Sequence, residues 1–385
     1  MFLRLVSTRQ GIPYHSNDHT FGERLMKECM HRINPFPDST STPTLNLRNK
    51  TLHFTPHGIE EKPFDKMDGL TYQLPYEYEP SATAPMFQKF LDRILPDKGV
   101  QHLIAQYIAY IFMPHLRLQK LMFLHDNGGG ETGKSTLVEI IEKLIGEDRC
   151  SAVPLYDLTT SENHRATLAV KLLNACKENN PKMNFEVFKS LAAREALTAK
   201  NPYKDPFTMR KYATCLFAMN SLPNAENTHA FHRRLIIVPF TQDKITKEER
   251  ILDLASIIIH KEAAGVLNFV IEGARSLLAN GNFIIPEVVI QAGLEYKTES
   301  CSAAMFMSHN GYEPGDECII TAQTLHNTYV EQYKGSKEYM LSDRTFYKRL
   351  RGLGYTVDKH GKKKTLMIHY NQDKDDDTKC TDENF

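Results

Sequence analysis

The chain has 385 residues, of which 41% are hydrophobic and 24% are charged, and its formal net charge is zero. This length allows two or three domains with buried cores, and no apolar run approaches the roughly 20 residues that cross a bilayer. The opening segment, MFLRLVS, lacks the long apolar core of a secretory signal. We therefore expect a cytoplasmic protein without a membrane partner.

The cysteines and histidines exclude a disulfide framework and a structural zinc site. Seven cysteines are scattered along the chain and none forms a C-x-x-C pair, which is typical of free thiols in a reducing compartment. The sixteen histidines show no metal-ligand spacing either.

The first third of the chain contains a linker, short strands and helices. Residues 1–44 have weak periodicity and end in a Pro/Ser/Thr stretch typical of a linker, and we assign them no function. Residues 45–80 alternate short apolar stretches with turn residues, which predicts a few short strands or extended loops at Leu45–Leu47, Leu52–Phe54 and Leu70–Tyr72. Apolar residues at helical spacing predict two helices between Ala84 and Met113, punctuated by Pro96 and Pro114. We expect residues 45–118 to form a small domain of strands and helices.

The next stretch has the pattern of a phosphate-binding loop. An apolar run from Leu121 to Leu124 predicts a buried strand, and apolar residues at helical spacing from Leu137 to Ile145 predict a helix. Between them the sequence fits G-x-x-x-x-G-K-[ST], in the strand–loop–helix context that a phosphate site requires. The candidate residues are Gly128, Gly129, Gly130, Glu131, Thr132, Gly133, Lys134, Ser135 and Thr136.

The residue types in this loop suit a nucleoside triphosphate with Mg²⁺. Glycines let backbone N–H groups turn toward phosphate oxygens, and the N-terminus of the following helix favours the same anion. Lys134 is placed to reach the β- and γ-phosphates, and the Ser135 hydroxyl to ligate Mg²⁺. The alternative is a glycine turn before an ordinary helix. We predict that ATP and Mg²⁺ are the cofactors.

Two further strands are predicted to end in polar residues beside this loop. The run from Leu168 to Cys176 predicts a buried strand followed by Glu178, which would hold Mg²⁺ or polarise the attacking water. The run from Ala213 to Met219 predicts another, followed by Asn220, which would orient water against the γ-phosphate. The alternatives are a surface glutamate and an asparagine that begins a proline turn.

A basic hairpin and an arginine pair complete the central region. The segment from Ala196 to Lys211 predicts two short strands around a turn. Basic and aromatic side chains together suit single-stranded nucleic acid, although a solvated hairpin has the same composition. The arginine pair precedes the apolar run that begins at Leu235, and one of the two could act as an arginine finger on a neighbouring subunit, or both could be exposed residues at a strand edge. The candidates are Lys200, Tyr203, Lys204, Arg210, Arg233 and Arg234.

The C-terminal region is predicted to be a winged-helix domain over residues 301–370. It contains a helix from Leu325 to Tyr333, a basic helix from Asp343 to Leu353 and a β-wing from Tyr355 to Tyr370. Basic residues on such a helix and wing suit phosphates of duplex DNA, and a protein-interaction domain is the alternative. The acidic residues 371–385 predict a disordered tail. The candidate DNA contacts are Arg344, Lys348, Arg349, Lys362 and Lys363.

The order and spacing of Lys134, Glu178, Asn220 and Arg234 resemble superfamily 3 helicases, hexameric AAA+-related motors. The resemblance is closest to the phage/plasmid and poxvirus-type primase-helicase family. It covers roughly residues 45–370 and is most specific over 121–240. The stretches that carry it are LPYEYEPSATAPMFQKFL, FKSLAAREALTAKNPYKDPF, FAMNSLP and AFHRRLIIVPF.

This resemblance implies an α/β fold: an AAA+-like P-loop ATPase over residues 119–300, with a small N-terminal region and a C-terminal winged helix. It implies that Glu178 is the Walker B acid, that Asn220 senses the γ-phosphate, and that Arg233 or Arg234 is the finger in trans. The hairpin with Lys200 and Lys204 would grip DNA in the channel of a homo-hexamer. The implied function is an ATP-dependent DNA helicase in the replication of a phage, plasmid or other mobile element.

The sequence departs from the family in two ways. Many relatives have two adjacent acids at the Walker B position, whereas Lys177 here precedes a single Glu178, so hydrolysis could be slower or use a different base. The segment ahead of residue 45 is too short for a primase domain, so a separate primase or polymerase is the expected partner. A weakly hydrolysing nucleotide-binding module that recruits replication proteins is the alternative function.

Overall fold

The computed structural model describes residues 44–55, 58–65, 68, 70, 73–114, 116–126, 130–178, 183–220, 222, 229–299, 302–334, 341–360 and 365–372. The predicted linker up to residue 43, the tail from 373, and the candidates Gly128, Gly129, Lys362 and Lys363 lie outside these residues. Glu178 is described by its backbone alone.

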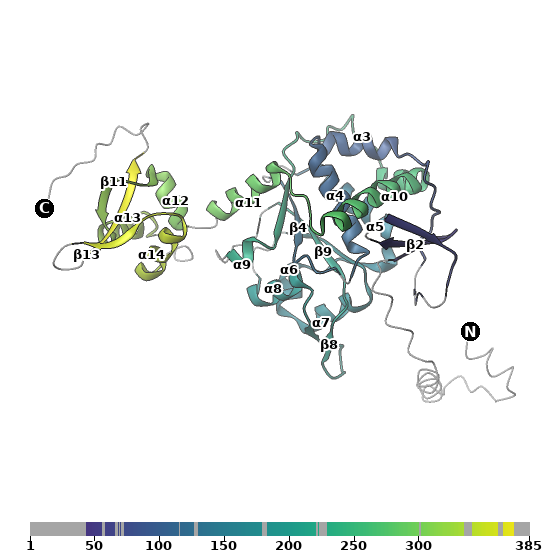
Figure 1. Ribbon diagram of the computed structural model, residues 1–385, viewed down its shortest axis with the longest axis horizontal. Coiled ribbons are helices and arrows are strands. Elements are labelled where there is room, and N and C mark those ends of the chain that lie inside the picture. The colour runs from purple at the N-terminus through teal and green to yellow at the C-terminus, as the bar shows by residue number, and fades with distance from the viewer. Residues whose placement is uncertain are drawn as a thin grey trace.

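A five-stranded parallel sheet forms the centre of the molecule, with strand order β10-β4-β9-β6-β5 (Figure 1). Both of its faces are covered, which explains why its longer strands are nearly continuous apolar runs rather than alternating ones. Because the strands are parallel, their carboxyl ends meet at one edge of the sheet. The strands are β4 (Leu121–His125), β5 (Cys150–Ser151), β6 (Leu173–Glu178), β9 (Thr214–Met219) and β10 (Leu235–Pro239).

One face of this sheet is covered by four long helices that share a single hydrophobic core. Two glycines of α10 allow close packing, because a Cβ at Gly265 or Gly273 would lie 2.3 Å from the backbone of Thr83 or Ala105. The helices are α3 (Pro85–Ile94), α4 (Lys98–Ile111), α5 (Lys134–Ile145) and α10 (Leu254–Asn280).

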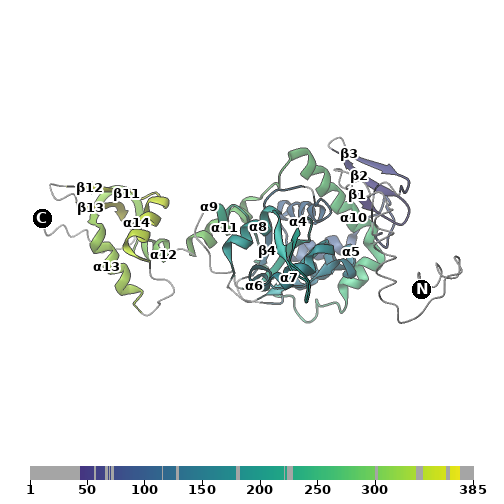
Figure 2. The ribbon, with the colours of Figure 1, turned by 90° about the horizontal axis from the view of Figure 1, so that it is seen from below.

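The N-terminal strands belong to the same core. Leu45, Leu52 and Phe54 pack with the helices of this face, and the Tyr76 hydroxyl donates to the carbonyl of Leu144 in α5 (2.8 Å). Figure 2 shows these strands at the end of the molecule opposite the C-terminal elements. The structure therefore does not divide residues 45–118 and 119–300 into separate cores. The strands are β1 (Thr44–Asn46), β2 (Thr51–Thr55) and β3 (Gly58–Lys62).

The other face of the sheet has a second core that contains Phe123, Phe188, Phe217, Phe231 and Tyr296. The short strands β7 and β8 pair antiparallel as the predicted basic hairpin. The elements are α6 (Leu155–Thr160), α7 (Glu162–Ala166), α8 (Phe185–Ala193), β7 (Leu197–Ala199), β8 (Phe207–Met209), α9 (His229–His232) and α11 (Glu287–Glu299), with 3₁₀ turns η2 (Glu147–Arg149) and η3 (Thr167–Val170).

The C-terminal elements form a third core around Phe306, Tyr329 and Phe346. They comprise three helices and a sheet of order β11-β13-β12. Both helices and the β-hairpin predicted for this region are present near their expected positions. The elements are α12 (Ser302–His309), β11 (Tyr312–Thr321), α13 (Ala322–Gln332), α14 (Asp343–Gly352), β12 (Val357–His360) and β13 (Thr365–Gln372).

One predicted strand was misplaced. The residues expected to begin it, from Leu168, form the 3₁₀ turn η3, and the strand runs instead from Leu173 to Glu178. Leu168 is fully buried in the turn, and its carbonyl accepts a hydrogen bond from the Ala213 N–H (3.1 Å). Its apolar side chain therefore serves the core without strand pairing, and Glu178 is the last residue of β6 rather than a residue beyond it.

Among the described helices, α10 is long and apolar enough to cross a membrane by length and composition. It instead packs against α3, α4 and α5, and half of its most apolar window is buried inside the protein. Its apolar character is that of a core helix.

Candidate nucleotide-binding site

The end of the predicted phosphate-binding loop requires glycine for two reasons. Gly133 is the N-cap of α5 and has a φ of 89°, in the left-handed region that side chains disfavour. A Cβ there would also lie 2.6 Å from Cγ2 of Ile94 on α3. The loop thus approaches α3 closely, and Gly130 and Glu131, with φ of 61° and 55°, continue the left-handed turn.

Lys134 is the first residue of α5, and its side chain is buried among polar groups, with 6% of its surface exposed. Its Nζ donates to the Met219 carbonyl (3.0 Å) and to Oδ1 of Asn220 (2.8 Å), and it forms an ion pair with Oδ1 of Asp126 (2.6 Å). Sequence reasoning selected Lys134 and Asn220 separately, and the structure brings them together.

Sequence reasoning missed Asp126. This carboxylate is 2% exposed, and its Oδ2 accepts a hydrogen bond from the Thr132 hydroxyl (3.0 Å). The signal was a charged residue directly after an apolar strand and two positions before the glycine run. Because it pairs with Lys134 and holds Thr132, Asp126 links both ends of the phosphate-binding loop.

The ends of three strands form one row beside this loop. In the sheet register, His125 of β4 and Glu178 of β6 both align with Met219 of β9. Asp126 and Asn220 follow that row directly, so the predicted acid and sensor positions lie on neighbouring strands. Within the described ranges, no cluster of three or more His, Cys, Asp or Glu side chains could hold a metal by itself.

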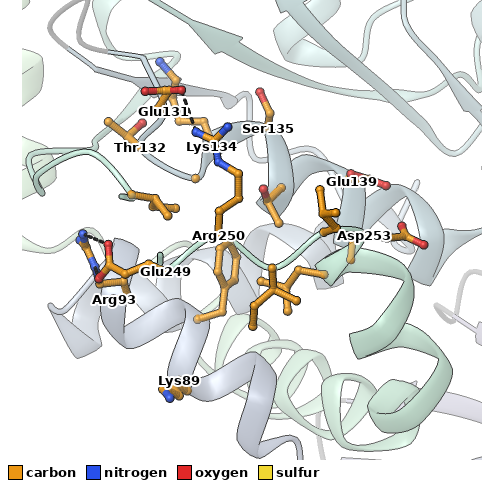
Figure 3. Close-up of a pocket in the computed structure, with 18 of the residues that line it drawn as sticks. Lys89, Arg93, Glu131, Thr132, Lys134, Ser135, Glu139, Glu249, Arg250 and Asp253 are labelled. Carbon is orange, nitrogen blue, oxygen red and sulfur yellow. Dashed lines mark hydrogen bonds and ion pairs between the residues drawn. The ribbon is translucent and has the colours of Figure 1, made fainter. Parts of the chain in front are cut away.

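A cavity of about 930 Å³ lies next to the loop (Figure 3). One wall, the phosphate wall, consists of residues 130–136 together with Asn220. The other wall, the far wall, comes from α3 and from a segment after β10. Its apolar part consists of Met86, Phe90, Ile245, Ile251, Leu252, Leu254 and Ala255. A cavity of this size, polar on one side and apolar on the other, suits a nucleotide.

Residues 243–253, which we call the strap, connect the two walls. The Ile245 N–H donates to the Glu131 carbonyl (3.0 Å), and Nη2 of Arg250 contacts Oε1 of Glu131 (2.7 Å; Figure 3). Arg93 of α3 binds Glu249 through two hydrogen bonds of 3.0 Å. The bonds from Arg93 hold the pKa of Glu249 at about 2, and Arg250 likewise lowers the pKa of Glu131.

The position of α3 depends on a buried acid of α10. Glu262, 9% exposed, accepts hydrogen bonds from the backbone N–H groups of Met86 and Phe87, both at 3.0 Å. These N–H groups lie in the first turn of α3 and have no partner within the helix. Glu262 therefore fixes the helix end that carries Met86 and Phe90 into the cavity.

The two candidate arginines differ in exposure. Arg233 is exposed, whereas Arg234 is 9% exposed and its guanidinium donates to the Ala230 carbonyl of its own chain. Both precede β10, at the amino edge of the sheet, and a five-residue strand of about 17 Å separates them from the phosphate-loop edge. Neither lines the cavity of its own chain.

The basic hairpin presents its candidates to solvent. Lys200, Tyr203, Lys204 and Arg210 are all exposed, and Tyr203 is fully exposed at the tip with a φ of 60°. Figure 1 shows the hairpin projecting from the body near α7.

The base of this hairpin is fixed by a buried arginine that sequence reasoning did not select. Arg194 is 7% exposed and donates to the carbonyls of Met113 (2.6 Å) and Leu116 (2.9 Å). Its guanidinium also stacks 3.7 Å above the Tyr110 ring. Because these carbonyls lie between the end of α4 and the start of β4, the hairpin is tied to the core at the amino edge of the sheet.

The basic helix α14 carries an exposed stripe. Arg344, Lys348 and Arg351 are exposed at i, i+4 and i+7, whereas Arg349 is half-buried. Arg351, a basic residue outside the predicted contact set, completes the stripe.

Two family models match the chain. Residues 14–96 match the family described as D5 N terminal like, and residues 127–234 match a family of unknown function, DUF5906. Similar solved structures include the A form apo structure of the NrS-1 C terminal region (15% identity, TM-score 0.47) and the apo structure of NrS-1 residues 305–718 (13%, 0.44). Each match covers 86% of this chain and 96% of the other. The chain is therefore similar to D5 N terminal-like proteins ahead of its phosphate-binding loop and to DUF5906 proteins across it.

Proposed function

We propose that this chain is an ATP-dependent DNA helicase that acts in the replication of a phage, plasmid or other mobile element. The observation that carries the proposal is the row of strand ends beside the cavity. Lys134 and Asn220 are in contact there, and the end of β6, which carries Glu178, is level with Met219, the residue before Asn220. The match to the D5 N terminal-like family, over the part of the chain that precedes the motor, supports a role in replication.

The residues of the phosphate wall have separate roles in this proposal. Lys134 exchanges its protein acceptors for phosphate oxygens of ATP, and Ser135 is placed in the first turn of α5 to ligate Mg²⁺. Glu178 acts on the attacking water, and Asn220 orients that water or the γ-phosphate. The bound triphosphate and Mg²⁺ supply the scissile bond and the charge neutralisation.

The arginine arrangement supports assembly of several copies. An exposed arginine at the amino edge of the sheet does not line its own cavity, so it can serve a nucleotide only on a neighbouring subunit. Arg233 fits this role better than Arg234, whose guanidinium is engaged within its own chain. A ring that closes through such contacts is the proposed state, and a hexamer is the expected size.

Two surfaces fit DNA. The hairpin tip combines Lys200 and Lys204 with the exposed ring of Tyr203, which suits backbone charge and base stacking on a single strand. The C-terminal unit, proposed as a winged helix, presents the stripe Arg344, Lys348 and Arg351 to duplex phosphates.

The alternative function is a nucleotide-binding module that hydrolyses weakly and recruits replication proteins. Lys177 in place of a second acid favours it, as does the ion pair that holds Lys134 on Asp126. Steady-state hydrolysis with and without single-stranded DNA separates the two functions. Turnover that DNA stimulates supports the motor, whereas nucleotide binding without turnover supports the module.

Coupling to DNA is tested with Lys200→Ala combined with Lys204→Ala. We expect unwinding of a forked duplex to be lost while basal hydrolysis is retained, because the hairpin lies away from the cavity. Lys261→Ala, an exposed lysine on α10, is the matched control and should leave both activities unchanged. Equal loss of unwinding and basal hydrolysis in the double variant would mean that the hairpin is structural.

A further inference from the structure

Asp126 is a buried acid of the nucleotide site that has no step in the proposed hydrolysis. It follows β4 directly, it is 2% exposed, and its Oδ1 lies 2.6 Å from Nζ of Lys134. A buried charge is costly unless it is paired, so this carboxylate and its lysine stabilise one another in the empty protein. The pair therefore bears on what happens when a phosphate approaches Lys134.

The ammonium group of Lys134 is already surrounded by oxygens of the protein. It has three N–H bonds, and three oxygens lie within 3.0 Å of it: the Met219 carbonyl, Oδ1 of Asn220 and Oδ1 of Asp126. Of these oxygens, only that of Asp126 belongs to a charged group, and charged acceptors bind an ammonium group most strongly. A phosphate that binds Lys134 must therefore compete with Asp126.

Asp126 is fixed in its place beside the loop. Its Oδ2 accepts a hydrogen bond from the Thr132 hydroxyl (3.0 Å), and it ends a strand that lies between β10 and β9 in the sheet. A phosphate in contact with Lys134 would lie close to this carboxylate, and two anions beside one cation repel each other. The ion pair therefore opposes the contact between Lys134 and phosphate.

We propose that Asp126 competes with the phosphates of ATP for Lys134 and thereby sets the affinity of the site for nucleotide. This inference rests on the proposed function, because it concerns the same lysine. Asp126 acts through Lys134 and is a positioning residue, which stabilises the empty protein more than the nucleotide-bound one. Loss of its charge should therefore destabilise the empty protein and tighten nucleotide binding, whereas a merely structural residue would weaken both.

The test uses Asp126→Asn, which keeps the shape of the side chain and an oxygen acceptor for the Thr132 hydroxyl but removes the charge. Calorimetric titration with a non-hydrolysable ATP analogue and Mg²⁺ should give a Kd about tenfold lower than that of the wild type, because no ion pair has to be broken. Without nucleotide the variant should melt at a lower temperature, because Lys134 is buried and would lack its counter-charge. Asp126→Ser, a second neutral variant, should show the same two changes.

Two control variants separate this competition from other effects of removing an acid. Asp68→Asn removes a buried acid that lies 3.5 Å from His53, outside the residues that line the cavity, and it should lower the melting temperature without changing the Kd. Glu139→Gln removes an acid that lines the cavity but pairs with Lys143 (3.7 Å) rather than with Lys134. Its Kd should differ from that of the wild type by less than about twofold, because solvent screens its charge.

A Kd that is unchanged or higher in both neutral variants of Asp126 would overturn the proposal and leave the nucleotide site itself intact. An equal gain in affinity in Glu139→Gln would also overturn it, since any negative charge lost near the cavity would then tighten binding. Wild-type protein that does not bind the analogue at all would overturn the proposed function together with this inference.

Discussion

The phosphate wall and the far wall of the cavity are built in different ways. The phosphate wall is nearly contiguous, because residues 130–136 supply most of it. The far wall joins α3 to the strap, and the Arg93–Glu249 pair that holds them is separated by 156 positions in the chain. A phosphate site can therefore be encoded locally, whereas the surface that would meet the base depends on the packing of distant segments.

The largest expected effect comes from Lys134→Ala on the phosphate wall. Loss of a charged donor aimed at phosphate should lower the hydrolysis rate by about 100-fold or more. The variant should also unfold more easily, by about 3–5 kcal/mol, because Asp126 would remain buried without its lysine. Steady-state hydrolysis and denaturant unfolding measure the two effects.

The double variant Asp126→Ala/Lys134→Ala is the control for this prediction. It should recover most of the lost stability, because neither charge remains buried, but none of the hydrolysis. Unfolding that is as easy as in the single variant would mean that the ion pair does not account for the destabilisation.

A smaller effect is expected for Phe90→Leu on the far wall. Loss of an aromatic face should weaken ATP binding by about fivefold, at the low end of base-stacking contributions, while leucine retains most of the packing. Binding of inorganic tripolyphosphate should not change, because it lacks a base. Calorimetry with both ligands checks this, and equal weakening of both would show that the two walls are not independent.

The Arg93–Glu249 ion pair, which we call the clamp, joins the two walls, and its removal should have a still smaller effect. Arg93→Ala removes an exposed ion pair with Glu249, and because solvent screens such pairs, nucleotide should dissociate only about two to five times faster. Arg275→Ala removes an exposed pair with Glu272 on α10 and serves as the matched control. Stopped-flow measurement of a fluorescent nucleotide gives both rates, and identical rates for the two variants would exclude the clamp.

The smallest expected effect is that of pH on this clamp. Arg93 lowers the pKa of Glu249 from 4.5 to about 2, so the contribution of the pair is fully present above the ordinary pKa and is lost only as the pH falls through about 2. The ratio of the Arg93→Ala and wild-type dissociation rates should therefore stay constant between about pH 8 and about pH 5. A ratio that approaches one near pH 5 would contradict the assignment.

Several elements could be predicted because their signals are local. The phosphate-loop helix and the strand ending at Met219 follow from apolar runs, and the basic hairpin follows from a cluster of turn residues. These patterns indicate the same local structure whatever the distant residues are. The strand assigned to Leu168–Cys176 was misplaced because an apolar residue can fill a core from a 3₁₀ turn as well as from a strand. The strand β3, with the sequence GIEEK, was not predicted because its exposed residues show no alternation.

The sequence by itself determined the strand, the glycine loop and the helix of the phosphate wall, and it predicts their phosphate chemistry, since glycine, lysine and serine at this spacing have few other uses. Tertiary structure decided which side chains from other parts of the chain lie next to this wall. Only the register of the sheet places Glu178 level with Met219, the residue before Asn220, and only the packing of α3, α10 and the strap completes the cavity. The physical reason is that backbone preferences and charge act over a few residues, whereas burial joins residues that the chain keeps far apart.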